Sequence, residues 1–106
     1  MPQEQDNALT RFNTLPKDVQ EAMFAEETAN AIHETAEKEG GLPQVSLLAE
    51  ITGDVMLGIL PITKFRGAIQ EGLKVDEEKA RRIAQQIRDR VFQKIAQSLR
   101  KIHKLE

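Results

Sequence analysis

The chain of 106 residues is 40% hydrophobic and 30% charged, with a net charge of -2. Its apolar content excludes a chain that is disordered by composition, and the lack of cysteine excludes a disulfide framework, a thiolate zinc site and a cysteine nucleophile. The near-neutral total is the sum of two opposed halves, because residues 1–63 hold 3 basic and 11 acidic side chains and residues 64–106 hold 12 basic and 6 acidic ones.

The N-terminal residues 1–13 are polar and acidic, and they lack the apolar stretch of a signal peptide. We expect them to form a flexible leader, with a turn of helix around Leu9 and Phe12, ahead of one domain, residues 14–106. The least polar stretch, residues 42–62, is the best candidate for a membrane span, but it contains Glu50 and Asp54. A charged side chain near the bilayer centre costs about 2.5–3.5 kcal/mol. No transmembrane segment is therefore expected, and a reducing cytoplasm is the simplest location.

Four helices are expected before residue 76, because apolar residues recur at helical spacing and never alternate strictly over the length of a strand. They cover about residues 14–24, 27–38, 43–58 and 61–72. The third contains an apolar turn, Val55-Met56-Leu57, that needs neighbours on several sides. We expect this helix to lie at the centre of the core.

A fifth helix is expected from Asp76, a favourable N-cap residue, to about Lys104, without an intervening glycine or proline. These 29 residues would extend about 43 Å, whereas a domain of this size is only about 34 Å across. The last turns are therefore expected to overhang the globule and to offer the apolar residues Leu99, Ile102 and Leu105 to a partner. The predicted fold is all-α, a single compact bundle of about five helices with a long C-terminal helix.

Three stretches of the chain have a distinctive order and spacing. They are Leu15–Gln20 with Ala22–Phe24 following, Leu48–Leu60, and Gly72–Asp76 with the helix that follows it to His103. Together they span about residues 14–104, and in this order they resemble a small, uncharacterised helical domain that recurs in proteins of reduced-genome bacteria. The resemblance implies a compact helical bundle, sometimes part of a longer protein. It implies no activity and no site residues.

The sequence contains no arrangement typical of an active site. His33 and His103 are 70 residues apart and belong to no metal-ligand spacing. The acidic residues of the second helix act as acids or bases only in a cleft that perturbs their pKa values, and a solvated helix face is the simpler interpretation. The glycines are spaced too irregularly for a phosphate or dinucleotide motif. We therefore expect no enzymatic activity, no metal and no cofactor.

The C-terminal helix carries basic residues on one face. At about 100° per residue, seven of its nine basic side chains lie within a strip about 120° wide, beside the apolar face. Six members of this basic strip are candidate contacts for an anion or a partner: Arg82, Arg90, Lys94, Arg100, Lys101 and Lys104.

Three interpretations of the basic strip remain open. It is a solvated face near the negative end of the helix dipole, a surface that docks on the chain's own acidic half (above all the glutamates of residues 27–38), or a site for nucleic acid or acidic lipid. An isoelectric point of about 5.7 and the lack of aromatic residues among the bases disfavour nucleic acid. We predict a non-catalytic α-helical interaction module that binds a protein partner or self-associates through its C-terminal helix. Non-specific anion binding through the strip is the alternative.

Overall fold

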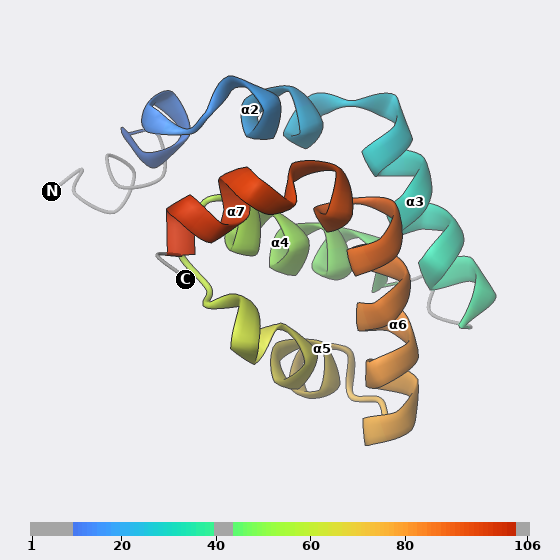
Figure 1. The fold of residues 1–106 in the computed structure, drawn as a ribbon. Helices are drawn as coiled ribbons and strands as arrows, with labels where there is room; N and C mark the ends of the chain where they lie inside the picture. Colours follow the sequence, from blue (N-terminus) through green and yellow to red (C-terminus); the bar gives the residue numbers. More distant parts are fainter. Residues whose placement is uncertain (1–9, 40–43, 104–106) are drawn as a thin grey trace, which may run out of the picture.

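Every regular element that the structure describes is a helix. The computed structural model describes residues 10–39 and 44–103, and for this part of the chain the all-α prediction is confirmed (Figure 1). After a short helix at residues 10–14, the α-helices are α2 (Lys17–Phe24), α3 (Glu26–Lys38), α4 (Val45–Met56), α5 (Phe65–Leu73), α6 (Glu77–Arg90) and α7 (Ala96–His103). Two 3-10 helices accompany them, η2 (Ile62–Lys64) before α5 and η3 (Phe92–Ile95) between α6 and α7.

The bundle begins within the segment that the sequence assigns to the leader. Residues 1–9 of that leader lie outside the described residues. Phe12 packs against the core, and its carbonyl accepts a hydrogen bond from Gln20 Nε2 at 2.7 Å. Arg11 Nη1 donates to the Gly58 carbonyl at 3.3 Å. Residues 10–13 are therefore a packed helical turn.

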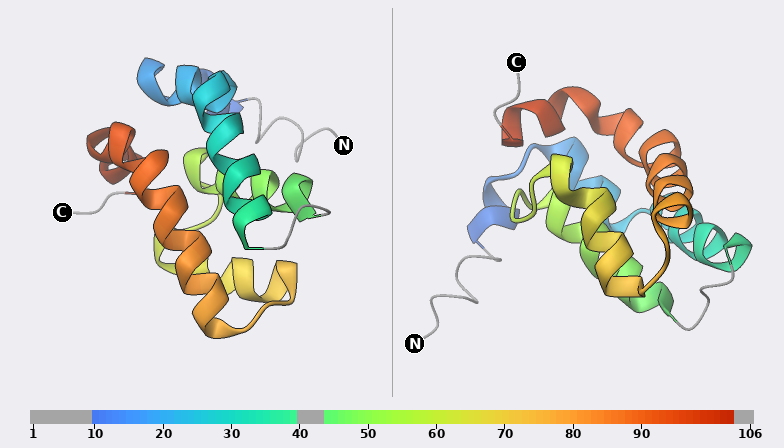
Figure 2. Two further views of the ribbon diagram at one scale, coloured as in Figure 1. Left: turned by 90° about the vertical axis from the view of Figure 1, so that its right-hand side faces the viewer. Right: turned by 90° about the horizontal axis from the view of Figure 1, so that it is seen from below.

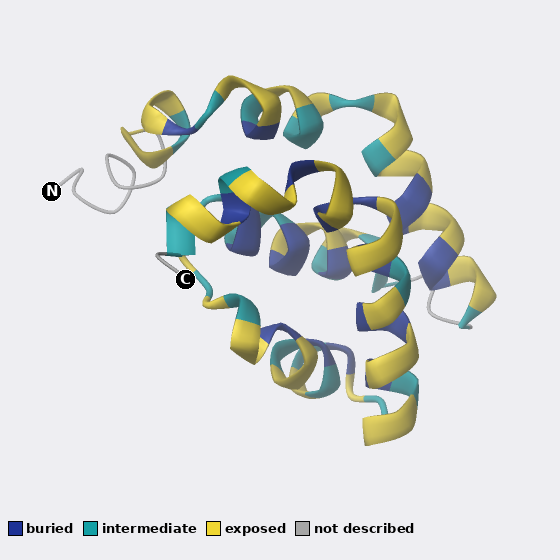
Figure 3. Ribbon diagram, in the orientation of Figure 1, coloured by how far each residue is buried: buried dark blue, intermediate teal, exposed yellow. Residues whose placement is uncertain are grey.

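The centre of the core is α4, as the sequence predicts. This helix packs against α2, α3 and α5. Leu48 and Val55 are fully buried, and Met56 is 1% exposed. The buried faces of α4, α6 and α7 all turn toward the interior (Figure 3). Most residues that the helical spacing marks as apolar therefore meet in one core.

The start of α6 also follows the sequence. Asp76 Oδ1 accepts a hydrogen bond from the backbone N–H of Lys79 at 2.7 Å, which is the expected N-cap. Glu77 and Glu78 occupy the first turn, where the helix dipole favours negative charge. The buried stripe of α6 consists of Ala80, Ile83, Ala84 and Ile87.

The prediction of one long C-terminal helix is wrong. The helical segment turns sharply after Arg90, and α7 folds back over the bundle (Figures 1 and 2). Val91, at the turn, has φ -118° and ψ -62°, and the next four residues form η3. We call Val91–Ile95 the elbow. The expected fifth helix is thus two helices of 14 and 8 residues.

The elbow forms because it buries more apolar surface than a straight helix would. Val91, Phe92, Ile95 and Leu99 are each at most 4% exposed, and burying a side chain of this kind contributes about 1.5–3 kcal/mol. The Phe92 ring packs edge-on against Phe65, with 5.1 Å between the ring centroids. A hydrogen bond contributes only about 0.5–1.5 kcal/mol net. Replacing one α-helical turn by the weaker 3-10 pattern therefore costs less than the burial contributes.

The elbow also removes the expected overhang. The described part of the molecule measures 34 × 32 × 28 Å, so no helix extends far beyond the others. Leu99 is 3% exposed and belongs to the core, and Ile102 packs partly buried against it. Leu105 lies outside the described residues. The apolar side chains expected to meet a partner at an overhanging end are instead covered by the chain itself.

Candidate functional site

The elbow divides the basic strip into two groups. Arg82 and Arg90 on α6 and Lys94 on η3 lie beside α3. Arg100 and Lys101 lie beyond the elbow on α7. Lys104 is outside the described residues. The strip is therefore not one continuous surface.

The first group contacts the acidic face of α3, which lies beside α6 (Figure 2). The distances are 3.2 Å from Arg82 Nη2 to Glu39 Oε1, 2.8 Å from Arg90 Nη2 to Glu34 Oε1, and 2.9 Å from Lys94 Nζ to Glu27 Oε1. We call these three contacts the α3–α6 ion pairs. In this group, the basic strip docks on the glutamates of the chain's own acidic half, which is one of the three interpretations left open by the sequence.

The α3–α6 ion pairs shift the pKa values of their members in the directions that pairing requires. The hydrogen bond from Lys94, followed by its charge, lowers the pKa of Glu27. The hydrogen bond to Glu39, followed by its charge, raises the pKa of Arg82. The Arg90–Glu34 and Lys94–Glu27 pairs are exposed on both sides, whereas the Glu39 side chain is only 10% exposed. Pairs at the surface add little to stability because water and salt screen them. They orient α3 on α6 more than they stabilise the fold.

The second group lies in a different environment. No carboxylate among the described residues forms an ion pair with Arg100 or Lys101. Lys101 borders a shallow hollow together with Arg11 and Ile102. Arg100 borders a separate and more apolar groove on the inner side of the elbow.

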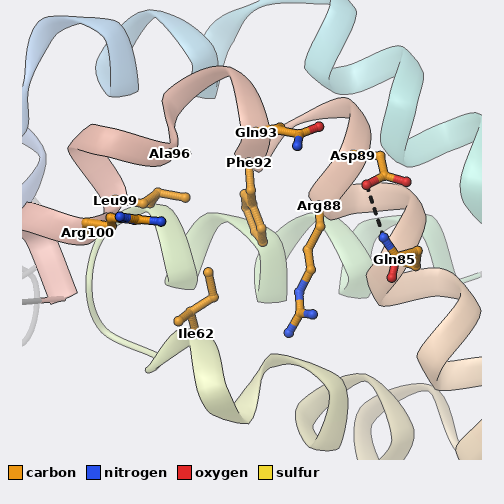
Figure 4. A pocket seen from close by; sticks show the side chains of 9 residues that line it. All are labelled: Ile62, Gln85, Arg88, Asp89, Phe92, Gln93, Ala96, Leu99 and Arg100. Carbon is orange, nitrogen blue, oxygen red and sulfur yellow. Dashed lines mark hydrogen bonds between the residues drawn. The ribbon is translucent and has the colours of Figure 1, made fainter. Parts of the chain in front are cut away.

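This elbow groove is framed by α6, η3 and α7 and faces η2 (Figure 4). Its volume is about 340 Å³, and it is open to solvent. Its apolar members are Ile62 and Ala96, which solvent reaches, and Phe92 and Leu99, which are each 3% exposed and form its base. Its polar members are Gln85, Arg88, Asp89, Gln93 and Arg100.

The two arginines of the elbow groove lie on either side of its apolar floor. Arg88 extends from α6 toward η2, and Arg100 lies beside Leu99 on α7 (Figure 4). Asp89, at the outer edge, accepts a hydrogen bond from Gln85 Nε2 at 3.0 Å. Guanidinium groups bind carboxylates through paired hydrogen bonds. The arrangement is therefore suited to a ligand that combines apolar side chains with negative charge.

Arg100 and Leu99 are predicted site residues, whereas Arg88 and Ile62 are not. Arg88 projects outside the basic strip on a straight helix, at about 180° from Lys79. The bend changes this relationship, because α7 turns back toward the side of α6 from which Arg88 projects. Ile62 comes from a different part of the chain, and no local spacing points to it.

The described residues hold no group of three His, Cys, Asp or Glu side chains placed to bind a metal ion. His33 is exposed on α3. His103 Nε2 donates to the carbonyl of Val55 at 2.8 Å, so it satisfies a carbonyl in the last turn of α4. Both histidines thus have ordinary positions in a helical protein.

Across residues 10–39 and 44–103, all helices are too short or too polar to cross a bilayer. Comparison of the chain with models of protein families, with curated proteins and with solved structures finds no match.

Proposed function

We propose that this protein is a non-catalytic interaction module and that its elbow groove binds an acidic, amphipathic helix of a partner protein. The observation that carries the proposal is the apolar floor between Arg88 and Arg100. The proposal involves no cofactor, and the partner is sought in the cytoplasm, the location expected from the sequence.

The size and shape of the elbow groove favour side chains over a small molecule. Small-molecule sites are concave, have volumes of about 300–1,000 Å³ and enclose most of their ligand. The groove lies at the lower end of this range and is open along one side. Such a hollow accepts one or two leucine-sized side chains that project from a helix, as in other helix-in-groove complexes.

Charge complementarity defines the partner further. Arg88 and Arg100 are exposed and project from two different helices. Glutamates beside the apolar anchors of a partner helix would meet both guanidinium groups. A basic helix would be repelled by them, so the arginines also provide selectivity.

A labelled helical peptide tests the proposal by fluorescence anisotropy. The probe carries leucines four residues apart with glutamates beside them, and a second probe carries lysines in place of the glutamates. We expect the acidic probe to bind and the basic probe to fail. Arg88→Gln and Arg100→Gln should each weaken binding about 10-fold to 100-fold, because a hydrogen bond to a charged group contributes about 1.5–3 kcal/mol.

Arg81→Gln is the matched control. Arg81 is exposed on α6, pairs weakly with Glu78 at 3.8 Å and lies outside the groove. Its loss should leave the affinity within about twofold. Equal binding of the acidic probe to the parent protein and to the Arg88→Gln/Arg100→Gln double variant would refute the proposal.

The second candidate function is non-specific binding of nucleic acid or acidic lipid through the basic strip. The adjacent, exposed residues Arg100 and Lys101 favour it. The α3–α6 ion pairs oppose it, because Arg82, Arg90 and Lys94 would have to exchange glutamates for phosphates. Binding to duplex DNA or anionic vesicles should then fall steeply with salt. Failure to bind either one at low ionic strength removes this candidate.

A further inference from the structure

The elbow joins two helices through a segment that retains the composition of a continuous helix. Residues 77–103 contain neither glycine nor proline, and η3 interrupts them for only four residues. The 3-10 pattern has poorer hydrogen-bond geometry than the α-helix. Straightening the elbow would therefore restore regular backbone hydrogen bonds, at the cost of removing α7 from its place on the bundle.

The place of α7 on the bundle is defined by contacts that a second copy of the chain could supply unchanged. Ser98 Oγ donates to the carboxylate of Asp18 at 2.9 Å. His103 Nε2 donates to the Val55 carbonyl. Leu99 lies in the core. Both hydrogen bonds join α7 to elements that precede α6, so the same two bonds form whether α7 comes from its own chain or from another.

The apolar stripe of α6 and the apolar stripe of η3 and α7 point in different directions. On a straight helix with Lys79 at zero, the four buried residues of α6 average about 90°, while Phe92, Ile95, Leu99 and Ile102 average about 180°. One straight helix therefore cannot face a single core with both halves. It can face two cores, with its first half on one bundle and its second half on another.

The contacts that hold α6 do not require the elbow. Arg82 and Arg90 pair with Glu39 and Glu34 of the same chain, ahead of the bend. Within the elbow, straightening would disturb the Lys94–Glu27 pair and the ring contact of Phe92 with Phe65, and the ring contact has to re-form between the two copies. An exposed pair of this kind contributes little to stability.

We propose that the chain forms a domain-swapped dimer in which α6, η3 and α7 become one straight helix and each α7 packs on the bundle of the other copy. Exchange of an identical element needs no new interface chemistry. The partner is a second copy of this chain. Its α7 would occupy the surface on α2 and α4 that α7 of the same chain covers in the monomer. The elbow groove is present only while the elbow is bent, so the swapped dimer would lack it and peptide binding would favour the monomer. The exchange rests on the contacts of α7 and not on the groove, so a groove that binds no peptide leaves this inference unchanged.

Engineered cysteine pairs test the exchange directly, because the natural chain has no cysteine. In Asp18→Cys/Ser98→Cys the two thiols lie across the contact between α2 and α7. In the control Glu39→Cys/Arg82→Cys they lie between α3 and α6, on the same side of the elbow. Each full-length variant is refolded at high and at low concentration, treated with a short bis-maleimide and separated on a denaturing gel.

We expect the first pair to give covalent dimers after refolding at high concentration and intramolecular links after refolding at low concentration. The control pair should give intramolecular links in both cases. Light scattering should show a dimer in the first condition. The proposal is overturned if the chain stays monomeric at high concentration, or if it dimerises while both pairs react only within one chain.

Gln93→Pro provides a second measurement. Gln93 is exposed and lies in the first turn of η3, where proline is tolerated, but it would lie in the interior of a straight helix. The variant should lower the dimer association constant at least about 100-fold, because two straight helices are broken at once. An unchanged dimer fraction would contradict the proposal. Should the variant not fold, the cross-linking result decides alone.

Discussion

Arg90 Nη2 lies 2.8 Å from Glu34 Oε1, and this contact joins the basic C-terminal half of the chain to its acidic N-terminal half. The two halves, whose charges nearly cancel in the total, are therefore neighbours in space along α3 and α6. Part of the opposite charge of the two halves is thus paired directly, in the α3–α6 ion pairs.

The Arg90–Glu34 pair predicts a small coupling that depends on salt. In a double-mutant cycle with Arg90→Gln and Glu34→Gln, urea denaturation should give about 0.2–1 kcal/mol of coupling at low ionic strength. At 1 M salt the screening length falls to about 3 Å, and the coupling should largely vanish. The Arg81–Glu78 pair, 3.8 Å apart and more exposed on both sides, is the control and should couple less. A coupling that salt does not change would argue against a direct ion pair.

The burial of Leu99 predicts a large loss of stability on truncation. Leu99 is 3% exposed, so Leu99→Ala should lower the free energy of unfolding by about 2–5 kcal/mol. Ile59 is 46% exposed, and Ile59→Ala should change it by no more than about 0.5 kcal/mol. Denaturant titration measures both. Equal, small effects would mean that α7 is not packed on the bundle.

Replacing two glycines by alanine should change the stability of the fold in opposite directions. Gly58 has φ +80°, and an added Cβ would lie 2.7 Å from Ile102 Cγ2. Gly58→Ala should destabilise by at least about 1–2 kcal/mol, because the left-handed conformation alone costs that much. Gly67 lies in α5 with no atom within 4 Å of the added Cβ, so Gly67→Ala should stabilise by about 0.5–1 kcal/mol. Thermal melts of the two variants should shift in opposite directions.

Neutralising the Asp54 side chain should stabilise the fold by an amount that depends on pH. Burial, and then the charge of Glu50, raise the pKa of Asp54 above its ordinary 3.8. An acid with a raised pKa in the folded state stabilises the fold below its unfolded pKa and loses this contribution as the pH rises through its folded pKa. Asp54 also occupies the last turn of α4, where the helix dipole disfavours negative charge.

Asp54→Asn should therefore raise the melting temperature at pH 7, with a gain of about 0.3–1 kcal/mol from the dipole alone. The difference from the parent protein should disappear below about pH 3.8. Glu21→Gln, in the last turn of α2 but exposed, is the control and should give a smaller gain. A constant difference from pH 3 to pH 8 would rule out the titration of Asp54 as its cause.

The helical spacing of apolar residues was enough to predict the all-α fold, the central position of α4 and the cap at Asp76. These features depend on local sequence. The elbow was missed because the segment lacks the glycine or proline that usually marks a bend. A signal was present, since the apolar stripe rotates by about 90° between residues 80–87 and residues 92–102.

The candidate site was less predictable than the fold. The basic strip and the α3 glutamates can be found from spacing alone, and docking of one on the other is one of the three interpretations that spacing leaves open. The structure pairs three members of the strip with Glu27, Glu34 and Glu39. The elbow groove depends on the bend. On a straight helix, Arg88 and Arg100 would be about 18 Å apart along the axis and would project about 120° apart. Only the folded chain brings both to one apolar floor with Ile62.

The contact between Ser98 and Asp18 spans 80 residues of chain. The ribosome adds about 5–20 residues per second, so Asp18 is synthesised roughly 4–16 s before Ser98. During this interval the buried side of α2, centred on Val19, lacks the cover that α7 later provides. The final closure of the bundle is therefore a late step of biosynthesis.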